Sequence, residues 1–239
     1  MNKNILEHEY TEKFPKGSHI RRMGNFLRKK KNPIILEFGV ERGTSTKSFV
    51  WLAEKLNGKV FSVDIDDCSS VSNSINWKFL KSDDLKIYHV LNKFVEIKEN
   101  GADLIYIDSY HENFHVIKLL NLYFEYVKKN GAIFIDDIDN VSYRKRYSVK
   151  KNWPAFWQCI VYDLTSDAVK EFYYNNMEQV YYTKYYGENG LGKFYKLSDL
   201  FEGPNHYKKL WKYNILIKIM YPYLRKLSNL INLKKLIKF

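Results

Sequence analysis

Cysteine is scarce in this chain, and long apolar runs are absent. Cys68 and Cys159 stand far apart in the 239 residues, without a CxxC pair or a Cys/His cluster, which argues against a disulfide-stapled secreted module. A chain of this length buries a core without disulfides. The N-terminus has charges where a signal peptide needs an apolar run, and no stretch approaches the roughly 20 apolar residues of a membrane-spanning helix. We therefore expect a reduced, cytoplasmic protein.

Acidic residues are absent from residues 203–239, which carry nine Lys and Arg. Residues 1–33 carry nine basic and three acidic residues, which leaves 21 basic and 24 acidic residues between 34 and 202. The net charge of +12 therefore belongs to the two ends. An evenly basic nucleic-acid binder is not expected. The basic ends would face either solvent or a polyanion such as an anionic membrane surface.

Strand-like and helix-like patterns alternate from Pro33 onward. Strands that alternate with helices form parallel sheets through right-handed crossovers. After Asp139 the alternation stops, and two strand-like stretches joined by "GENG" predict an antiparallel hairpin. The predicted strands are 33–39, 58–66, 76–84, 102–108, 131–137, 179–186 and 191–197, and the predicted helices are 44–56, 85–97, 111–129 and 155–164.

The expected fold is therefore α/β: a Rossmann-like, doubly wound, mostly parallel sheet that ends in an antiparallel hairpin, with a basic helical C-terminal tail. Residues 1–32 form a basic N-terminal segment, a candidate substrate or lid region. Residues 33–200 form the main domain, and residues 201–239 form the tail.

The stretch "LEFGVERGTS" joins the first predicted strand to the first helix. Gly39 and Gly43 permit a tight turn and a close approach of ligand to backbone. A dinucleotide fingerprint needs a second glycine where Glu41 stands, so a ligand without phosphates is favoured. Glu37 would suit a cationic amino-acid portion of such a ligand if it faces the pocket. The alternative is an ordinary strand–helix turn.

Two further aspartates follow predicted strands. Asp64 ends the second strand, 21 residues after Gly43, where a carboxylate can accept hydrogen bonds from ribose hydroxyls. Asp83 follows the third strand, near the expected position of an adenine edge. In the alternative interpretation, Asp83 or Asp84 caps the next helix.

Acidic residues also follow the fourth and fifth strands, in "IDSYHENF" and "FIDDID". Neighbouring parallel strands bring their carboxyl ends together, so Asp108, Asp136 and Asp137 are expected to converge. Three carboxylates repel each other unless a cation lies among them, and oxygen ligands favour Mg²⁺ or Mn²⁺. His111 could accept a proton near neutrality in the same mouth. The alternatives are a surface or capping histidine and a turn with capping acids.

The ordered set of these residues resembles a class I S-adenosylmethionine-dependent methyltransferase over roughly residues 33–197. The resemblance implies a methyltransferase domain over 33–200, with S-adenosyl-L-methionine as its cofactor. The residues that would bind the cofactor are Glu37, Gly39, Gly43, Ser45, Asp64 and Asp83.

"IDSYHENF" and "GAIFIDDID" are also similar to motifs of the macrocin and mycinamicin-type sugar O-methyltransferases. That similarity implies Mg²⁺ at the three aspartates and His111 as the base that activates a sugar hydroxyl. "TEKFPKGSHI" is similar to their Asp-Lys-(x)n-His segment, with Glu12 in place of Asp, which implies Lys13 and His19 as candidate substrate contacts. The usual glycine after Asp108 is Ser109 here.

The expected function is O-methyl transfer to a sugar hydroxyl of a bacterial-type glycan or glycoconjugate. The alternatives are a metal-independent methyltransferase on the same fold, a sugar transferase that uses "DID" as its metal motif, and a non-catalytic basic module. Residues 204–239 combine nine basic residues with Trp and Tyr and lack acids, which fits peripheral contact with anionic lipid at the inner face of the membrane. These residues would otherwise pack on the core or on another subunit of a homo-oligomer.

Overall fold

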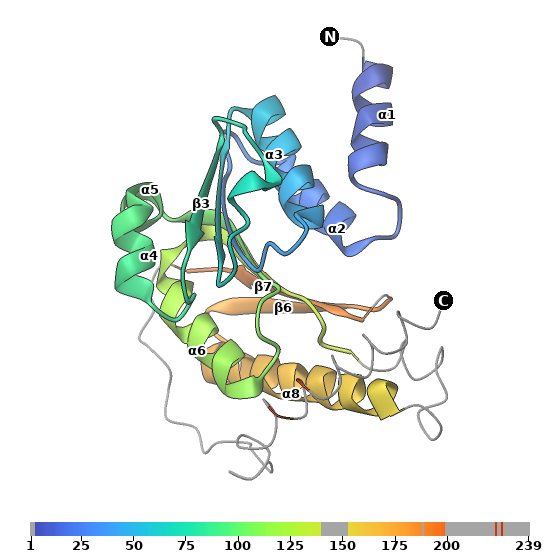
Figure 1. Cartoon of the computed structure of the whole chain (residues 1–239), viewed down its shortest axis with the longest axis vertical. Helices are drawn as coiled ribbons and strands as arrows, with labels where there is room; N and C mark the ends of the chain where they lie inside the picture. Colours follow the sequence, from blue (N-terminus) through green and yellow to red (C-terminus); the bar gives the residue numbers. More distant parts are fainter. Residues whose placement is uncertain (1–2, 140–152, 188, 199–222, 224–225, 227–239) are drawn as a thin grey trace.

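The computed structural model (Figure 1) describes residues 3–139, 153–187, 189–198, 223 and 226. Its centre is a seven-stranded sheet in the order β3-β2-β1-β4-β5-β7-β6. The first five strands in this order pair in parallel, and β7 pairs antiparallel with both β5 and β6. The predicted α/β fold and its terminal hairpin are confirmed. The strands are β1 (Ile34–Phe38), β2 (Lys59–Asp64), β3 (Trp77–Lys81), β4 (Ala102–Ile107), β5 (Val127–Ile135), β6 (Val180–Tyr185) and β7 (Leu191–Lys196).

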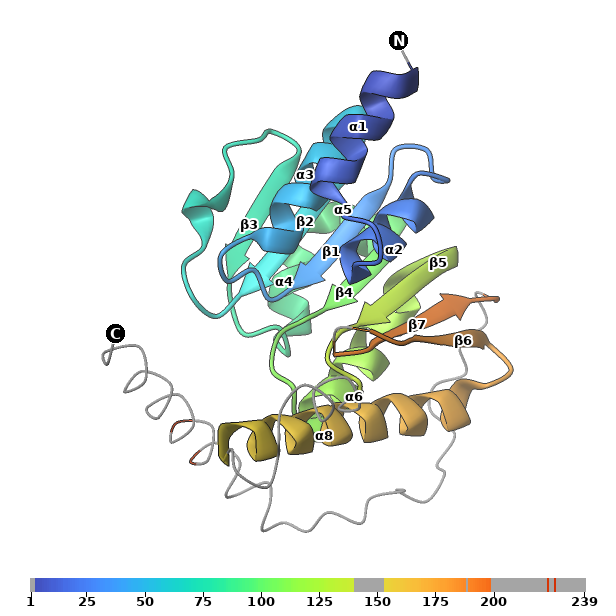
Figure 2. The same ribbon diagram turned by 90° about the vertical axis from the view of Figure 1, so that its right-hand side faces the viewer.

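Helices cover both faces of the sheet (Figures 1 and 2), as a doubly wound fold requires. One face packs beneath α1 (Lys3–Lys13), α2 (His19–Leu27) and α3 (Thr44–Leu56). The other face packs on α4 (Ile87–Lys93), α5 (Val95–Asn100), α6 (Asn113–Tyr123) and α8 (Trp153–Asn176). The described residues also contain two short 3₁₀ helices, η1 (Ser69–Val71) and η2 (Phe124–Tyr126).

Several helix boundaries differ from those predicted. The helix expected over 111–129 ends at Tyr123, because Val127 already pairs with Ala102 of β4 as the first residue of β5. The stretch 85–97 is interrupted at Phe94, whose backbone angles leave the helical region. The helix expected over 155–164 is longer and continues to Asn176. Helical spacing of apolar residues therefore located these segments but not their ends.

Strand β4 is buried at every residue and forms the middle of the core. Alternate residues of a strand point to opposite faces, so Leu104 and Tyr106 join the cluster under α3, whereas Ile105 and Ile107 join the cluster under α6. The Tyr106 ring packs edge-on against Phe49 at 5.9 Å between centroids. Its hydroxyl therefore lies at the carboxyl edge of the sheet, on the side of α2 and α3.

The N-terminal helices belong to this core. Tyr10 of α1 and Phe14, which directly follows that helix, are buried and stacked at 4.7 Å between centroids, and Met23 and Leu27 of α2 are buried as well. The described part of the segment 1–32 is therefore packed on the domain. The predicted tail, 201–239, lies outside the described residues except at two positions. No helix within the described ranges is long and apolar enough to span a bilayer.

Candidate functional site

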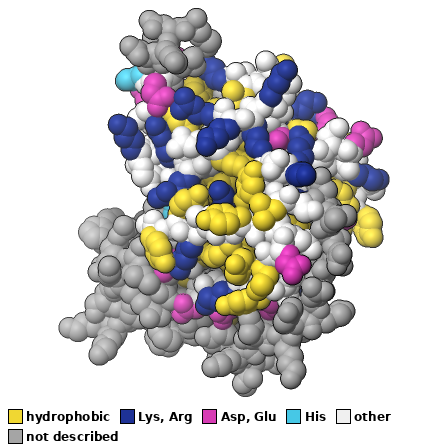
Figure 3. All heavy atoms as spheres, turned by 180° about the vertical axis from the view of Figure 1, so that it is seen from behind, with side chains coloured by type: hydrophobic (Ala, Val, Ile, Leu, Met, Phe, Trp, Pro, Cys, Tyr) yellow, Lys and Arg dark blue, Asp and Glu magenta, His cyan; other side chains and the backbone are white. Residues whose placement is uncertain are grey.

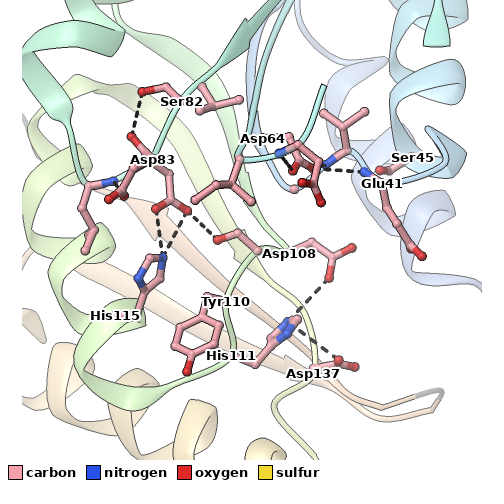
Figure 4. A pocket seen from close by; sticks show the side chains of 18 of the residues that line it. Glu41, Ser45, Asp64, Ser82, Asp83, Asp108, Tyr110, His111, His115 and Asp137 are labelled. Atoms are coloured by element: carbon pink, nitrogen blue, oxygen red, sulfur yellow. Dashed lines mark hydrogen bonds and ion pairs between the residues drawn. The ribbon is translucent and has the colours of Figure 1, made fainter. Parts of the chain in front are cut away.

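A cavity of about 680 Å³ opens at the carboxyl ends of the five parallel strands (Figure 4). This is where open α/β sheets bind ligands, and the volume is typical of a small-molecule site. Residues from the loop after each of these strands line it. The predicted site residues among them are Gly39, Ser45, Asp64, Asp83, Asp108, His111 and Asp137.

The turn between β1 and α3 requires its two predicted glycines. Gly39 has φ +92° and Gly43 has φ +75°, a region that other residues rarely adopt. A Cβ on Gly39 would clash with the carbonyl oxygen of Asp108, and a Cβ on Gly43 would clash with Val71. Glu41, between them, has φ +48° and an exposed side chain at the cavity rim. Gly39 therefore lets the backbone approach the loop after β4, and Gly43 lets it approach η1.

Asp64 fixes this turn from the end of β2. One carboxylate oxygen accepts hydrogen bonds from the backbone N–H groups of Val40 at 2.7 Å and Glu41 at 3.1 Å. The other accepts from the N–H of Asp66 at 2.9 Å. Each carboxylate oxygen has two acceptor sites, so the side chain retains acceptor capacity toward the cavity that it lines (Figure 4). Its predicted contact with ribose stays a prediction.

Glu37 lies beneath the turn and is absent from the cavity lining. The carboxylate is fully buried and accepts hydrogen bonds from the hydroxyls of Ser45 at 2.6 Å, Thr46 at 2.7 Å and Ser62 at 2.7 Å. Burial raises the pKa of Glu37, and the three hydroxyl donors oppose that shift. The condition that Glu37 faces the pocket is therefore not met. Its carboxylate instead anchors Ser45, which does line the cavity.

The loop after β3 contains one predicted residue and one that sequence reasoning missed. Asp83 accepts a hydrogen bond from the N–H of Leu85 at 2.9 Å, which closes a turn before α4. Asp84 is buried and pairs with His115, with 3.0 Å between Oδ1 and Nε2, while Ser109 donates to its other oxygen at 2.7 Å. No sequence signal marks the pair, because its members are 31 residues apart.

His111 lies between two acidic side chains at the other end of the cavity (Figure 4). Its Nε2 is 3.5 Å from Asp108 Oδ1 and 3.7 Å from Asp137 Oδ2. Burial, followed by the charges of Asp136 and Asp137, raises the pKa of Asp108 well above its usual range. Burial, followed by the charge of Asp136, raises the pKa of Asp137 to about 7. The predicted convergence of Asp108, His111 and Asp137 is therefore present.

Asp136 does not line the cavity with them. Its Oδ1 is 2.9 Å from Nδ1 of His19, and its Oδ2 accepts the hydroxyl of Tyr106 at 2.6 Å. Burial acts to raise the pKa of Asp136, but the hydrogen bond and charge of His19, and then the hydroxyl of Tyr106, hold it below its usual range. Within the described ranges no group of three or more His, Cys, Asp or Glu is arranged to hold a metal ion. The expected open site of three carboxylates is thus not assembled here: only Asp108 and Asp137 face the cavity.

The two candidate substrate contacts have different positions. His19 is buried beside the acidic cluster, and its Nε2 is 3.0 Å from the carbonyl oxygen of Gly187. Lys13 is exposed at the end of α1. Neither residue lines the cavity, and contact with a substrate stays a prediction for both. Tyr106, which the sequence marked only as a buried strand residue, contacts both Asp108 and Asp136.

Residues 36–138 match the model of a family described as a methyltransferase domain. The matched part, less than half of the chain, resembles a methyltransferase domain. It contains all five parallel strands apart from the first two residues of β1, and it includes every loop that lines the cavity. No curated protein matches the chain in sequence.

Solved methyltransferases share the fold at low sequence identity. The MycE methyltransferase from the mycinamycin biosynthetic pathway, in complex with Mg and SAH, is 18% identical with a TM-score of 0.52, over 83% of this chain and 56% of that one. The SAH-bound methyltransferase PaMTH1 of Podospora anserina is 16% identical with a TM-score of 0.50, over 82% of this chain and 88% of that one. CalS11, a TDP-rhamnose 3'-O-methyltransferase of calicheamicin biosynthesis, is 13% identical with a TM-score of 0.51, over 74% of this chain and 78% of that one. The predicted resemblance to class I S-adenosylmethionine-dependent methyltransferases is confirmed for the domain and its fold.

Proposed function

We propose that the methyltransferase domain transfers a methyl group from S-adenosylmethionine to a sugar hydroxyl of a bacterial-type glycan or glycoconjugate. The observation that carries the proposal is the position of His111 between Asp108 and Asp137, at one end of a cavity whose other walls come from the glycine turn and Asp64. A base flanked by carboxylates suits deprotonation of a hydroxyl. MycE, which has also been solved with mycinamycin VI, and CalS11 support the choice of a sugar-bearing acceptor by their likeness in fold.

The cavity suits S-adenosylmethionine. Because Gly39 has no Cβ, its backbone can lie close to the carbonyl oxygen of Asp108. Ser45, Asp64 and Asp83 line the walls where the amino-acid and nucleoside portions of the cofactor would bind. When bound, the sulfonium supplies an electrophilic methyl group. Because that group is already reactive, the protein has mainly to position the acceptor oxygen in line with it.

His111 would take the proton of the acceptor hydroxyl on a ring nitrogen as the oxygen attacks. Asp108 and Asp137 lie within 3.5 and 3.7 Å of its Nε2, so their negative charges would stabilise the imidazolium that forms. This is the role of a carboxylate beside a catalytic histidine. The same two side chains restrict the directions in which the imidazole ring can turn.

The oxygen atoms of Asp108 and Asp137 also fit a hard cation, because burial, followed by the charge of Asp136, raises the pKa of both carboxyl groups. We propose that these two residues hold Mg²⁺, or Mn²⁺, which keeps several waters and needs only one or two carboxylates. When bound, the ion would lower the pKa of the acceptor hydroxyl. Asp136 is assigned no direct contact in this proposal, since His19 and Tyr106 already bind its oxygens.

Three measurements test the proposal. Calorimetry with S-adenosylhomocysteine should show binding, and no binding at about 1 mM would refute the proposal. His111→Gln should leave this binding within about threefold and lower methyl transfer about 100-fold or more, the range for loss of a general base. EDTA should abolish turnover; unchanged turnover in EDTA would support the metal-independent alternative.

The tail carries a separate proposal that rests on sequence. We propose that residues 204–239 bring the enzyme to anionic lipid, where a lipid-linked glycan acceptor would be made. On the face shown in Figure 3, the Lys and Arg side chains of the described residues are scattered among apolar and other side chains. Full-length protein should co-sediment with anionic vesicles at low salt more than a chain that ends at Gly203. Equal sedimentation would refute the proposal.

A further inference from the structure

Two buried side chains and one partly buried carboxylate, from three elements, meet behind the acidic end of the cavity. Tyr106 comes from β4, Asp136 follows β5, and His19 is the first residue of α2. Tyr106 and His19 are 3% and 4% exposed. The Tyr106 hydroxyl is 2.6 Å from Asp136 Oδ2, and His19 Nδ1 is 2.9 Å from Asp136 Oδ1. None of the three lines the cavity, and the proposed methyl transfer uses none of them.

The hydrogen-bonding roles in this group follow from the partners. A phenol has one proton to donate. The Tyr106 hydroxyl is 2.6 Å from Asp136 and 3.1 Å from Asp108, so it donates to Asp136. His19 faces a carboxylate at Nδ1 and the carbonyl oxygen of Gly187 at Nε2. Both partners are acceptors, so His19 donates from both nitrogens. Charge-assisted hydrogen bonds of this kind to a partly buried carboxylate are strong and short.

The fixed carboxylate of Asp136 in turn affects its neighbour. The backbone N–H of Asp137 donates to Asp136 Oδ1 at 2.9 Å. Asp137 has φ +56°, a conformation that is uncommon for residues other than glycine, although aspartate adopts it more readily than most. The hydrogen bond from its N–H is one interaction that holds this conformation and aims the Asp137 side chain at the cavity beside His111.

We propose that Tyr106 and His19 are positioning residues, which fix the carboxylate of Asp136 and through it the placement of Asp137 at the cavity. The proposal deepens the proposed function and rests on it for its kinetic consequences. His19, the first residue of α2, thereby joins the N-terminal segment to the carboxyl end of the sheet through its hydrogen bond to Asp136.

Tyr106→Phe removes only the hydroxyl. We expect the kcat of methyl transfer to fall about 10- to 100-fold, the range for loss of a hydrogen bond to a charged group. Binding of S-adenosylhomocysteine should stay within about threefold, because the ring does not line the cavity. The matched control is Tyr10→Phe, which removes another buried hydroxyl, bonded to Asn25 at 2.9 Å on the far side of α2. Its kcat should stay within about twofold.

Two amide variants separate the bonds of His19. The Nδ2 of asparagine can replace Nδ1, so His19→Asn should keep the bond to Asp136. The Nε2 of glutamine can replace the other ring nitrogen, so His19→Gln should keep the bond to Gly187 instead. We expect His19→Asn to have a kcat at least about fivefold above that of His19→Gln. The reverse order, or equal loss, would overturn the role assigned to Asp136.

A double-mutant cycle provides a readout that does not need activity. Because Tyr106 and His19 share one carboxylate, Tyr106→Phe and His19→Gln should be non-additive in the urea unfolding equilibrium constant by about threefold or more. Tyr106→Phe combined with Tyr10→Phe should be additive. If the wild type binds no S-adenosylhomocysteine, the proposed function fails, yet the cycle still tests the shared carboxylate. Additive effects of Tyr106→Phe and His19→Gln, or a full kcat in Tyr106→Phe, would overturn the inference.

Discussion

Replacement of Asp137 by asparagine should stabilise the protein at neutral and alkaline pH. Its pKa is about 7 in the folded protein and 3.8 in an ordinary aspartate, chiefly because of burial and the charge of Asp136. An acid with a raised folded-state pKa binds its proton more tightly when folded. Between about pH 4 and pH 7 the folded state therefore holds more protons, and the free energy of unfolding falls as the pH rises.

The magnitude follows from the two pKa values. A change from 3.8 to about 7 corresponds to about 4 kcal/mol at 1.36 kcal/mol for each tenfold change in proton affinity. Asparagine has no such titration, so the stability of the variant relative to wild type should rise with pH by up to that amount. Because the repulsion is shared with Asp108 and Asp136, we expect about 2 to 4 kcal/mol between pH 4 and pH 8. A hydrogen bond that the asparagine amide fails to make lowers the stability of the variant equally at pH 4 and pH 8, so it does not alter the change with pH.

Urea unfolding at several pH values, with EDTA present, measures this difference. Asp167→Asn on α8 is the control, because that carboxylate pairs only with the exposed Lys170, and its difference from wild type should change by less than about 0.5 kcal/mol. Magnesium should stabilise the wild type more than Asp137→Asn if the two carboxylates hold the ion. A difference that stays flat between pH 4 and pH 8, or that falls, would refute the account of Asp137 as a strained carboxylate at this site.

Three further outcomes are expected. In urea unfolding, Gly39→Ala should destabilise the fold by about 3 kcal/mol or more, because φ is +92° and the Cβ would clash with the carbonyl of Asp108. The control is Gly17→Ala, which has φ +84° but open space around the new Cβ and should cost only about 1 kcal/mol. Asp64→Asn should weaken S-adenosylhomocysteine binding about 10-fold or more in calorimetry, since the carboxylate holds the turn through two N–H groups; unchanged affinity would count against its place in the cofactor site. Asp137→Asn should weaken Mn²⁺ binding, measured by electron paramagnetic resonance, about 10-fold more than Asp136→Asn, and the opposite order would restore Asp136 as a ligand.

Much of the fold followed from short-range patterns in the sequence. Apolar runs located all seven strands, and the alternation of strands with helices, followed by the hairpin turn, indicated a parallel sheet with an antiparallel end. Asp108, His111 and Asp137 were predictable as neighbours because residues that follow adjacent parallel strands share one edge of the sheet. These inferences needed only chain order and the rules for parallel sheets.

Side-chain direction was beyond such patterns. Glu37 was expected to face the ligand, but it is inside the sheet with three hydroxyl partners, two of which lie on α3 and one on β2. Asp136 was grouped with its neighbour, yet it turns toward a histidine 117 residues earlier in the chain. The pair of Asp84 and His115 depends on where α6 packs. Each of these arrangements depends on tertiary packing, which no local spacing encodes.

The most direct test of the central claim is calorimetric titration of the folded protein with S-adenosylhomocysteine. The account predicts one site per chain, with a dissociation constant of about 1 to 100 μM, weakened by Asp64→Asn and unchanged by Tyr106→Phe. Absence of binding at about 1 mM, in protein shown by circular dichroism to be folded, would contradict the claim that this cavity is the cofactor site of a methyltransferase.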